Sequence, residues 1–589
     1  MRRLLCTFVL LCGCCSLLFA NDSPAPTSPT KTITVKQWEE MEKAVTEGKV
    51  KGDTAWMMIS TALVMLMIPG LALFYGGMVR RKNVLGTMMH SMVPLAIVGV
   101  YWIVIGYSLA FGHSQGGLIG WSTDLICLHG IKPDAMLPNT NIPVYLHVLF
   151  QGMFAIITPA LISGAMAERI RFLPYCIFTL LWSVLVYTPL AHWVWAMDWY
   201  GPVAGTFGSG SEYVGWLGAK PGKGLGALDF AGGTVVHIAA GVAGLAAVLV
   251  LPSRRGYPNN PIHPNSIILT LLGAGLLWFG WFGFNAGSAT ASSTNATSAF
   301  LATQVAAAAA ALSWMVVEWI HRKKPTALGL ASGLVAGLVA VTPASGFIYP
   351  AGAVIIGLLA GICCYGAVYL KTRLKYDDSL DAFGVHGVGG FLGAILTGFF
   401  WFKAVNDPSN AAGSEGLLAG GSTTQIFAQL YAAIVAALFS FAISFVMIKI
   451  LKVSLHASEE VESEGLDLTQ HGEVGLELGV ELSEPVVRAV PRHADVPPNG
   501  VKRFTLRLDG IDPDELTQRW SKLCQETEGP PNSDFKVIYS HVTTVEGNRF
   551  RFRYGDPDTI ASHLEKLFQD RLHRQDIKAV LEAKPLQAA

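Results

Sequence analysis

DFAGGTVVHIAAGVAG, at residues 229–244, and DSLDAFGVHGVGGFLG, at residues 378–393, are two copies of one pattern in very apolar sequence. Both read D-x7-H-x3-G-x2-G, with a valine before each histidine. A histidine inside a membrane-spanning helix is costly and is therefore treated as functional. Two histidines in matching repeats indicate a pair arranged around a pseudo-two-fold axis, as in transport proteins. We interpret the two copies as a conduction site.

The composition is that of a protein with many membrane-spanning helices. Of 589 residues, 51% are hydrophobic and only 14% are charged, and the mean hydropathy is +0.43. Soluble domains carry about 25% charged residues. We therefore expect an all-α polytopic membrane protein. No basic stripe exists outside short loops, which argues against a nucleic-acid partner.

The first residues have the parts of an export signal. MRRLLCTFVLLCGCCSLLFA, residues 1–20, has a basic start, an apolar stretch and a final alanine, so a cleaved signal peptide is predicted. Residues 21–53 would then be an exported polar segment at the mature N-terminus. Four of the nine cysteines lie in this leader, and the others lack disulfide or metal spacing. No metal or other cofactor is expected.

Eleven apolar segments are long enough, at about 20 residues each, to cross a hydrocarbon core of about 30 Å. Together they place a membrane domain at residues 54–452. The segments are residues 54–79, 85–112, 143–168, 171–198, 228–251, 264–287, 296–320, 325–345, 347–370, 382–404 and 424–452.

Basic loops give the orientation in the membrane. Every odd-numbered span is followed by positive charges, as at Arg80–Lys82 and His321–Lys324, whereas the loops after even-numbered spans have few. The positive-inside rule then places the mature N-terminus outside and the C-terminus in the cytoplasm. Spans one to five and six to ten would form a five-plus-five inverted repeat, with the Asp–His pattern opening the fifth and the tenth. Such repeats place the substrate path at their interface.

After residue 452 the sequence becomes polar and acidic. Residues 453–500 are interpreted as a tail and linker, and residues 501–582 as a small α+β domain on the cytoplasmic side. The pattern of that domain predicts five elements. They are a strand at 503–508, a helix at 513–527, strands at 536–545 and 549–554, and a helix at 559–572.

The paired histidines have two interpretations. A single histidine in a membrane helix is about as often a hydrogen-bonding contact between helices as a functional group. The repeat favours function, because packing alone rarely requires the same Asp, His and Gly twice. Two neutral imidazoles, His237 and His386, can share a proton and line an apolar pore. Asp229 and Asp378 are expected mainly to cap helix N-termini and to favour cations electrostatically, rather than to bind a cation directly.

Aromatic residues gather in three segments near the ends of spans. The segments are FQGMF (residues 150–154), HWVW (residues 192–195) and WFGWFGFNAGS (residues 278–288). Most such residues form belts at the membrane interface. Several ring faces beside a hydrogen-bond acceptor can instead bind a cation at the mouth of a pore. The sequence leaves open which rings converge.

Four segments resemble one known family. They are FYGGMVRRKNVL (residues 74–85), DFAGGTVVH (229–237), GWFGFNAGSA (280–289) and DAFGVHGVGG (381–390). Each is similar to a motif of the ammonium transporter family (Amt/Mep/Rh), and the resemblance covers about residues 53–473. It implies transport of ammonium or methylammonium across the cell membrane by a homotrimer of eleven-span protomers, each with its own pore.

The resemblance implies how the pore is entered. In the family a Trp, a Phe and a Ser recruit ammonium at an outer vestibule, and the matching residues are Trp195, Phe154 and Ser288. Two stacked phenylalanines close the pore below the vestibule, and they match Phe154 and Phe284. The presence of Trp195 and Ser288 is typical of the Amt/Mep branch rather than the Rh branch.

The resemblance also assigns the pore. The twin histidines of the family match His237 and His386, and its conserved aspartate matches Asp229. Ammonium and potassium are similar in size and charge, but only ammonium can lose a proton. An apolar pore would therefore stop potassium by its dehydration cost. The hypothesis is deprotonation at the Phe pair, ammonia in the pore and proton transfer along the histidines.

GLDLTQHGE, residues 465–473, resembles the regulatory tail of the family, which contacts the neighbouring protomer. The family often binds a trimeric PII-type signalling protein at this face, which implies nitrogen regulation. Thr469 is a weak phosphorylation candidate. The usual Ala-Tyr after the tail is missing, and the domain at 501–582 would add to, replace or occlude the PII contact. The matching tail residues are Gly465, Asp467, Thr469, His471 and Gly472.

Two other functions compete with transport. An ammonium sensor would signal through the C-terminal domain, which has no kinase, cyclase or phosphatase motif. A membrane metalloenzyme would need a third ligand and a base, as in H-E-x-x-H, and the sequence has none. We therefore expect no catalytic or metal-binding residues and no enzymatic activity.

Overall fold

The computed structural model describes residues 33–218, 226–259, 262–405 and 415–475, and parts of 504–581. Those parts are 504–516, 518, 520, 542–546, 549–552, 557–572 and 576–581. The chain divides into two compact units, Met1–Gly479 and Val480–Ala589. The expected signal peptide at 1–20 and the linker from 476 to 500 lie outside the described residues.

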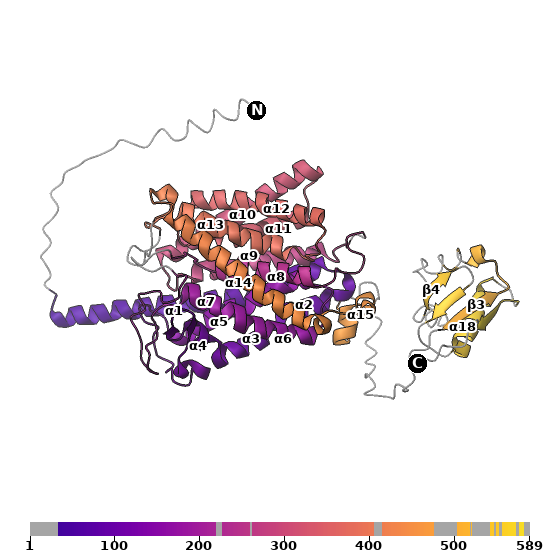
Figure 1. Ribbon diagram of the computed structural model, residues 1–589, viewed down its shortest axis with the longest axis horizontal. Coiled ribbons are helices and arrows are strands. Elements are labelled where there is room, and N and C mark those ends of the chain that lie inside the picture. Colours follow the sequence, from indigo (N-terminus) through magenta and orange to yellow (C-terminus); the bar gives the residue numbers. More distant parts are fainter. Residues whose placement is uncertain are drawn as a thin grey trace, which may run out of the picture. The chain divides into compact units, whose positions relative to one another are not determined.

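The first unit is a bundle of apolar helices (Figure 1). Within the described residues, ten helical segments are long and apolar enough to cross a membrane, so the unit is a polytopic membrane fold. The segments are α1 (Val35–Met78), η1 to α4 (Arg81–Phe111), α5 (Val144–Met166), α6 to α7 (Phe172–Trp195), η5 to α8 (Gly233–Val250), α9 (Ile267–Gly287), α10 (Thr294–Arg322), α12 (Pro350–Leu374), η6 to α13 (Phe383–Phe400) and α14 (Thr424–Leu455).

Four of these segments contain a π-helical turn. Such turns are rare and often lie at functional sites. Two of them, η5 and η6, carry His237 and His386. The four are η2 (Trp102–Gly106) between α3 (Pro94–Tyr101) and α4 (Tyr107–Phe111), η4 (Ser183–Tyr187) between α6 (Phe172–Trp182) and α7 (Thr188–Trp195), η5 (Gly233–Ile238) before α8 (Ala239–Val250), and η6 (Phe383–Gly387) before α13 (Val388–Phe400).

The eighth expected span, residues 325–345, corresponds to α11 (Ala327–Val341), a helix of 15 residues. At 1.5 Å per residue it is about 22 Å long, which is less than the roughly 30 Å of a hydrocarbon core. The Thr326 hydroxyl caps its start by accepting from the backbone of Gly329. The described residues therefore give ten spans, and the count of eleven stays a prediction.

α1 begins well before the first expected span. Thr34 and Gln37 form a capping box, in which each side chain accepts from the backbone N–H of the other. The helix then continues without a break for 44 residues. Residues 33–49 are exposed, and this part of α1 extends beyond the bundle in Figure 1. The segment expected to be polar and separate is thus helical from Val35 onward.

Glycines allow α1 and α9 to pack closely. A Cβ on Gly273 would lie 2.3 Å from the backbone nitrogen of Phe74. A Cβ on Gly280 would lie 2.6 Å from the carbonyl oxygen of Leu63. Small residues are the usual means by which membrane helices approach one another. This contact joins the first helices of the two expected halves.

Shorter elements connect the spans. Within the second span, η1 (Arg81–Asn83) and α2 (Val84–Met92) precede α3. The loop after α4 holds β1 (Ser114–Gln115), β2 (Ile119–Gly120) and η3 (Thr123–Leu128). Later in the chain are η7 (Leu417–Ala419), α15 (Glu459–Glu464) and η8 (Asp467–His471).

The described part of the second unit is an antiparallel sheet with the helix α18 (Pro557–Leu572) and a further helical stretch at 513–516. The strand order is β4-β5-β3-β6, and α18 precedes the last strand. Strand β6 was not expected from the sequence, and the helix expected at 513–527 is described at 513–516 and little beyond. The strands are β3 (Phe504–Asp509), β4 (Val542–Glu546), β5 (Arg549–Phe552) and β6 (Lys578–Leu581).

Candidate functional site: a histidine pair between two cavities

The two repeated histidines lie against each other inside the bundle. His237 on η5 and His386 on η6 are both buried, with their Nδ1 atoms 3.3 Å apart. The rings are stacked at 24°, with centroids 5.3 Å apart. A hydrogen bond between two Nδ1 atoms requires one neutral imidazole to donate and the other to accept. The pair is therefore arranged to share one proton.

The glycines of each copy make room for the histidine of the other. A Cβ on Gly241 would lie 2.2 Å from the backbone nitrogen of Gly387, beside His386. A Cβ on Gly390 would lie 2.9 Å from the Cβ of His237. A larger side chain at either glycine would push the two helices apart. In the spacing D-x7-H-x3-G, the glycine of each copy therefore packs beside the histidine of the other copy.

Asp229 lies at the start of η5 and is buried. Its carboxylate accepts four hydrogen bonds from the first backbone N–H groups of the helix, which otherwise have no partner inside the helix. The two oxygens are both occupied by this cap. The donors are Gly232 (3.0 Å) and Gly233 (2.6 Å) to Oδ1, and Thr234 (2.9 Å) and Val235 (3.1 Å) to Oδ2.

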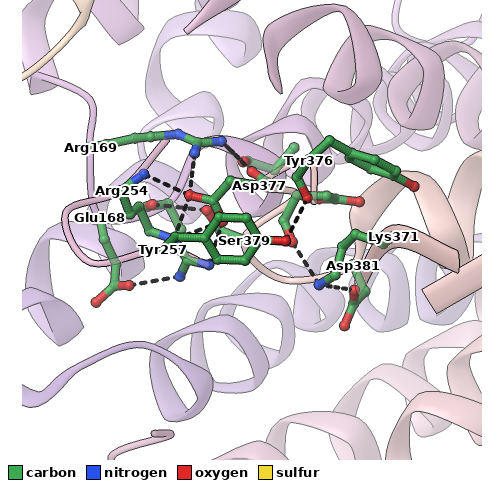
Figure 2. Close-up of polar contacts among 12 residues, drawn as sticks. Glu168, Arg169, Arg254, Tyr257, Lys371, Tyr376, Asp377, Ser379 and Asp381 are labelled. Atoms are coloured by element: carbon green, nitrogen blue, oxygen red, sulfur yellow. Dashed lines mark hydrogen bonds and ion pairs between the residues drawn. The ribbon is translucent and has the colours of Figure 1, made fainter. Parts of the chain in front are cut away.

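Asp378 holds the start of η6 in a similar way but with fewer bonds. Its Oδ1 accepts from Ala382 N at 3.1 Å, and its Oδ2 accepts from Phe383 N at 2.9 Å. The backbone carbonyl of Asp378 accepts from Lys371 Nζ at 3.0 Å. Lys371 in turn forms an ion pair with Asp381 (Figure 2).

A cavity of about 10 Å³ lies beside the two histidines. That is about the room for one water-sized molecule. The N–H of Trp281, a residue that sequence reasoning did not place in the pore, donates to Thr342 Oγ1 at 2.9 Å. Apart from His237 and His386, the lining is apolar or aromatic: Met67, Leu71, Phe74, Ile157, Leu161, Val236, Leu277, Trp281, Phe284 and Val335.

A column of rings leads to the histidines. Trp195 packs edge-on against Phe154, with centroids 6.0 Å apart. Phe154 packs on Phe284 at 4.2 Å, and Phe284 stacks on His237 at 6.0 Å. Both phenylalanines are fully buried. The structure thus brings four of the residues named from the sequence into one line.

The other side of this column opens into a larger cavity, which we call the vestibule. Its volume is about 350 Å³, and its lining includes Trp195, Phe154, Ser288 and Asp229. The Ser288 hydroxyl donates to the carbonyl of Phe284 at 2.9 Å, which leaves its oxygen lone pairs free to accept. All three residues expected to recruit a cation therefore line one cavity.

A third cavity, of about 30 Å³, lies on the opposite side of the histidines. It shares Phe74, Val335 and His386 with the pore cavity. Its lining also includes Tyr75, Ser332 and Asp381. The order along the bundle is therefore vestibule, Phe pair, histidine pair and inner cavity. We call the end beyond the inner cavity the tail end.

Buried charges gather at the tail end, in what we call the tail-end ion network (Glu168, Arg169, Arg254 and Asp377; Figure 2). Arg254 pairs with Asp377 at 2.7 Å and with Glu168 at 2.8 Å. Arg169 pairs with Asp377 at 2.6 Å. Glu168 follows α5, Arg254 follows α8 and Asp377 precedes η6. The network therefore joins loops of both expected halves.

The arginines keep the two carboxylates ionised. Burial alone would raise the pKa of Glu168 and of Asp377, but the arginines outweigh it and hold both pKa values below their usual range. Arg169 and Arg254 follow the third and fifth expected spans, so in the sequence they are among the positive charges that indicate only the orientation in the membrane. The sequence does place charged residues within a few positions of several span ends, and this pattern could have predicted a network of ion pairs there.

The tail packs on loops of the same chain. Asp467 accepts from Gly86 N at 2.7 Å and from Leu85 N at 3.0 Å, which caps the start of α2. The backbone of Leu466 donates to Asn83 at 2.9 Å, and Asn83 donates to Glu168 at 2.9 Å. A hydrogen-bonded path therefore runs from the tail to the tail-end ion network.

The remaining tail residues lie in the same region. Gly465 has φ +113°, a conformation that favours glycine, and Gly472 has φ +68°. Thr469 Oγ1 donates to the carbonyl of Gly465 at 2.7 Å. The ring of His471 lies edge-on to Phe172, with centroids 4.9 Å apart. None of these five expected tail residues lines the three cavities described above.

The fold and site define a class of protein: a multi-pass membrane protein with a narrow apolar path through its helices. Within the described residues, no group of three or more His, Cys, Asp or Glu side chains is placed to hold a metal ion. The family model of the Ammonium Transporter Family matches residues 55–476. This chain belongs to the ammonium transporter family.

Individual relatives agree with this membership. An ammonium transporter of Bacillus subtilis (strain 168) is 47% identical over 427 residues, which is 72% of this chain and 98% of that protein. The crystal structure of Saccharomyces cerevisiae Mep2 matches with a TM-score of 0.60 at 33% identity, covering 69% of this chain and 88% of that one. A structure described as "Sensor Amt Protein" matches with a TM-score of 0.62 at 30% identity, covering 72% and 99%.

Proposed function

We propose that this protein transports ammonium, and methylammonium, across the cell membrane along the path that passes His237 and His386. The observation that carries the proposal is the order of the site. An aromatic vestibule is followed by a stacked Phe pair and a cavity for a single small molecule beside two hydrogen-bonded imidazoles. Membership of the ammonium transporter family supplies the substrate.

In this proposal the cation is held in the vestibule. Trp195 and Phe154 offer ring faces to a positive charge, and Ser288 offers an oxygen acceptor. The capped carboxylate of Asp229 adds a negative charge to the same cavity. These are the features that a desolvated ammonium ion requires, because it needs both cation–π contact and hydrogen-bond acceptors.

The charge is shed before the pore. One N–H bond of ammonium breaks at the Phe pair, where Phe284 stacks on His237, and Nε2 of His237 accepts the proton. The electron pair stays on nitrogen, and neutral ammonia enters the cavity beside the histidines. The proton passes along the shared Nδ1–Nδ1 hydrogen bond of His237 and His386 and rejoins ammonia beyond them. Potassium has no proton to lose, so the apolar lining excludes it by the cost of dehydration.

Transport in proteoliposomes tests the proposal. Ammonium gradients should drive a current in the wild type, whereas potassium gradients should not. The double variant His237→Ala, His386→Ala should lose the ammonium current or admit potassium. His129→Ala, an exposed histidine, is the matched control and should leave the current unchanged. A double variant that still carries ammonium current and excludes potassium would contradict the proposed proton transfer along the histidines.

The wider arrangement is part of the same proposal. We place the mature N-terminus outside and the tail end in the cytoplasm, with α11 as one of eleven helices in a five-plus-five inverted repeat. The protomers form a homotrimer, and the tail lies at the cytoplasmic face, where a PII-type protein binds. The α+β domain at 501–582 is also cytoplasmic and adds to, replaces or occludes that contact. Native mass spectrometry of the purified protein, alone and with a PII protein, measures both assemblies.

A second candidate function is ammonium sensing. It is favoured by the match to a structure described as "Sensor Amt Protein" and by the sheet that follows the membrane unit in this chain. Deletion of residues 490–589 separates the two functions. Unchanged methylammonium uptake together with a lost nitrogen response would favour sensing, and reduced uptake would favour a role of the domain in transport.

A further inference from the structure

One face of α5 brings two further polar side chains to the vestibule. His147, Gln151 and Phe154 are spaced so that they lie on the same side of the helix. All three line the vestibule. Phe154 already has a place in cation recruitment, whereas the proposed function uses neither His147 nor Gln151.

His147 is held rigidly and is fully buried. Its ring packs edge-on against Trp199 at 4.8 Å and against Phe111 at 5.4 Å, measured between centroids. Its Nδ1 lies 2.8 Å from the Tyr107 hydroxyl. These three contacts fix the ring plane, so the position of Nε2 is fixed as well.

Two polar atoms on this face lack a protein partner. Among the described residues, neither Nε2 of His147 nor Oε1 of Gln151 has a hydrogen-bond partner, and both atoms are buried. A buried polar atom without a partner destabilises the folded state, because it has lost its hydrogen bonds to water and gained none in return. Such atoms in a native structure therefore need an explanation. Both residues line the vestibule, which points to a ligand in that cavity.

The hydrogen bonds behind His147 allow Nε2 to be an acceptor. The Tyr107 hydroxyl lies 3.0 Å from the Tyr200 hydroxyl as well as near His147. When Nδ1 of His147 donates to Tyr107 and Tyr107 donates to Tyr200, Nε2 carries a lone pair and no hydrogen. A bare ring nitrogen and an amide oxygen then belong to two residues that are one helical turn apart on α5 and that both line the vestibule.

We propose that His147 Nε2 and Gln151 Oε1 form a hydrogen-bond-accepting subsite that receives N–H groups of ammonium in the vestibule. This inference rests on the proposed function and adds the residues that set its specificity. Imidazole nitrogen is a poor ligand for hard cations, which prefer oxygen. The subsite therefore favours a cation that donates hydrogen bonds over potassium, and ammonium with four N–H groups over methylammonium with three.

Transport kinetics in proteoliposomes test the subsite. His147→Phe keeps a ring but removes the acceptor, and should raise the ammonium concentration for half-maximal transport about tenfold. The maximal rate should change less than the half-maximal concentration. The half-maximal concentration for methylammonium should rise less than that for ammonium, so the ratio between the two substrates should narrow. A purely structural role would affect both substrates alike.

Rescue and control variants keep the test decisive. His147→Gln can place an amide oxygen near the original Nε2 and should restore most of the affinity for ammonium. Gln151→Met should act like His147→Phe, and it decides the question if His147→Phe does not fold. His129→Phe, on an exposed loop, should behave like the wild type. Unchanged half-maximal concentrations in folded His147→Phe or Gln151→Met would overturn the subsite, whereas a wild type that carries no ammonium would overturn the proposed function instead.

Discussion

The helix start at Asp229 and the helix start at Asp378 carry the same pattern, yet their carboxylates are held differently. Asp229 accepts four backbone N–H groups of its own helix. Asp378 accepts two, and it lies next to Asp377 of the tail-end ion network and near the Lys371–Asp381 pair. The first is a self-contained cap beside the vestibule. The second is part of a larger polar cluster.

The difference teaches that one sequence pattern can depend on two kinds of support. The first copy needs only its own backbone. The second copy is tied through Asp377, Arg254 and Glu168 to Asn83, and from there to the backbone of Leu466 in the tail. Changes at the tail can therefore reach the start of the second histidine helix through Asp377, whereas they reach the first histidine helix only at its far end, where Arg254 follows α8. Four measurements would break or sharpen this contrast.

Replacement of Asp229 by alanine should have the largest effect. Four N–H groups at a buried helix start would lose their acceptor, at about 1 kcal/mol or more each. The free energy of unfolding should therefore fall by about 4 kcal/mol, which thermal unfolding in detergent would report. Asp229→Asn keeps one of the two accepting oxygens, so its free energy of unfolding should fall by about half as much. Wild-type stability in Asp229→Ala would show that the cap is not self-contained.

Replacement of Asp377 by alanine should reduce the free energy of unfolding by nearly as much as replacement of Asp229. It leaves the buried Arg169 and Arg254 without their shared carboxylate. Removing one partner of a buried ion pair costs about 3–5 kcal/mol, which the same unfolding measurement would detect. The matched control is Asp381→Ala, whose side chain is 32% exposed beside Lys371 and should cost about 1 kcal/mol or less. Equal losses in both variants would mean that burial does not set the strength of this network.

Replacement of Asp378 by alanine should cost less than replacement of Asp229. Only two N–H groups lose an acceptor, which amounts to about 2 kcal/mol. The comparison with Asp229→Ala in parallel melts is the direct test of the contrast between the copies. Asp378→Asn should lie between Asp378→Ala and the wild type. If Asp378→Ala is the more damaging of the two alanine variants, the network contributes to the cap more than its hydrogen bonds show.

The dependence of stability on pH should be the smallest effect and should have two parts. Burial raises the pKa of Asp378 to about 6, and this opposes folding while the group is ionised. Stability should therefore rise slightly as the pH falls from 7 towards 5. The pKa values of Glu168 and Asp377 are lowered, so their contribution is full above their usual pKa near 4 and is lost as the pH falls further.

Melting curves from pH 7 to pH 3 would measure both parts. The loss at low pH should reach about 1.4 kcal/mol per pH unit for each group that gains a proton on unfolding. Asp378→Asn should abolish the rise between pH 7 and pH 5 and keep the loss below pH 4. A stability that only increases on acidification would contradict the ionised state of the tail-end ion network.

The sequence was informative wherever a local pattern determines the structure. Apolar runs of sufficient length predicted most ends of the ten spans to within a few residues. The repeated motif predicted that His237 and His386 form a pair. The capping box at Thr34 and Gln37 could also have revealed the early start of α1, but the polar composition of the segment suggested a boundary. Composition predicts burial, and a helix can continue where burial ends.

Other features depend on contacts between distant segments. Glu168, Arg254 and Asp377 lie in three separate loops, so no spacing in the sequence pairs them. The vestibule acceptors were missed for a similar reason, because His147 is identified by its unpartnered nitrogen and by Trp199 from another loop. Strand β6 is four residues long and has no turn signal strong enough to define it. These features are set by contacts between segments that are distant in the sequence, which local periodicity does not predict.

The pore cavity of about 10 Å³ has a kinetic consequence. Channels that pass ions quickly hold several at once, and repulsion between neighbours drives each one forward. A cavity with room for a single small molecule cannot hold such a queue. In the proposed mechanism, occupancy beside the histidines is therefore zero or one, and each turnover waits for the previous molecule to leave. The rate should saturate with concentration, and two permeant species should compete for the same single place.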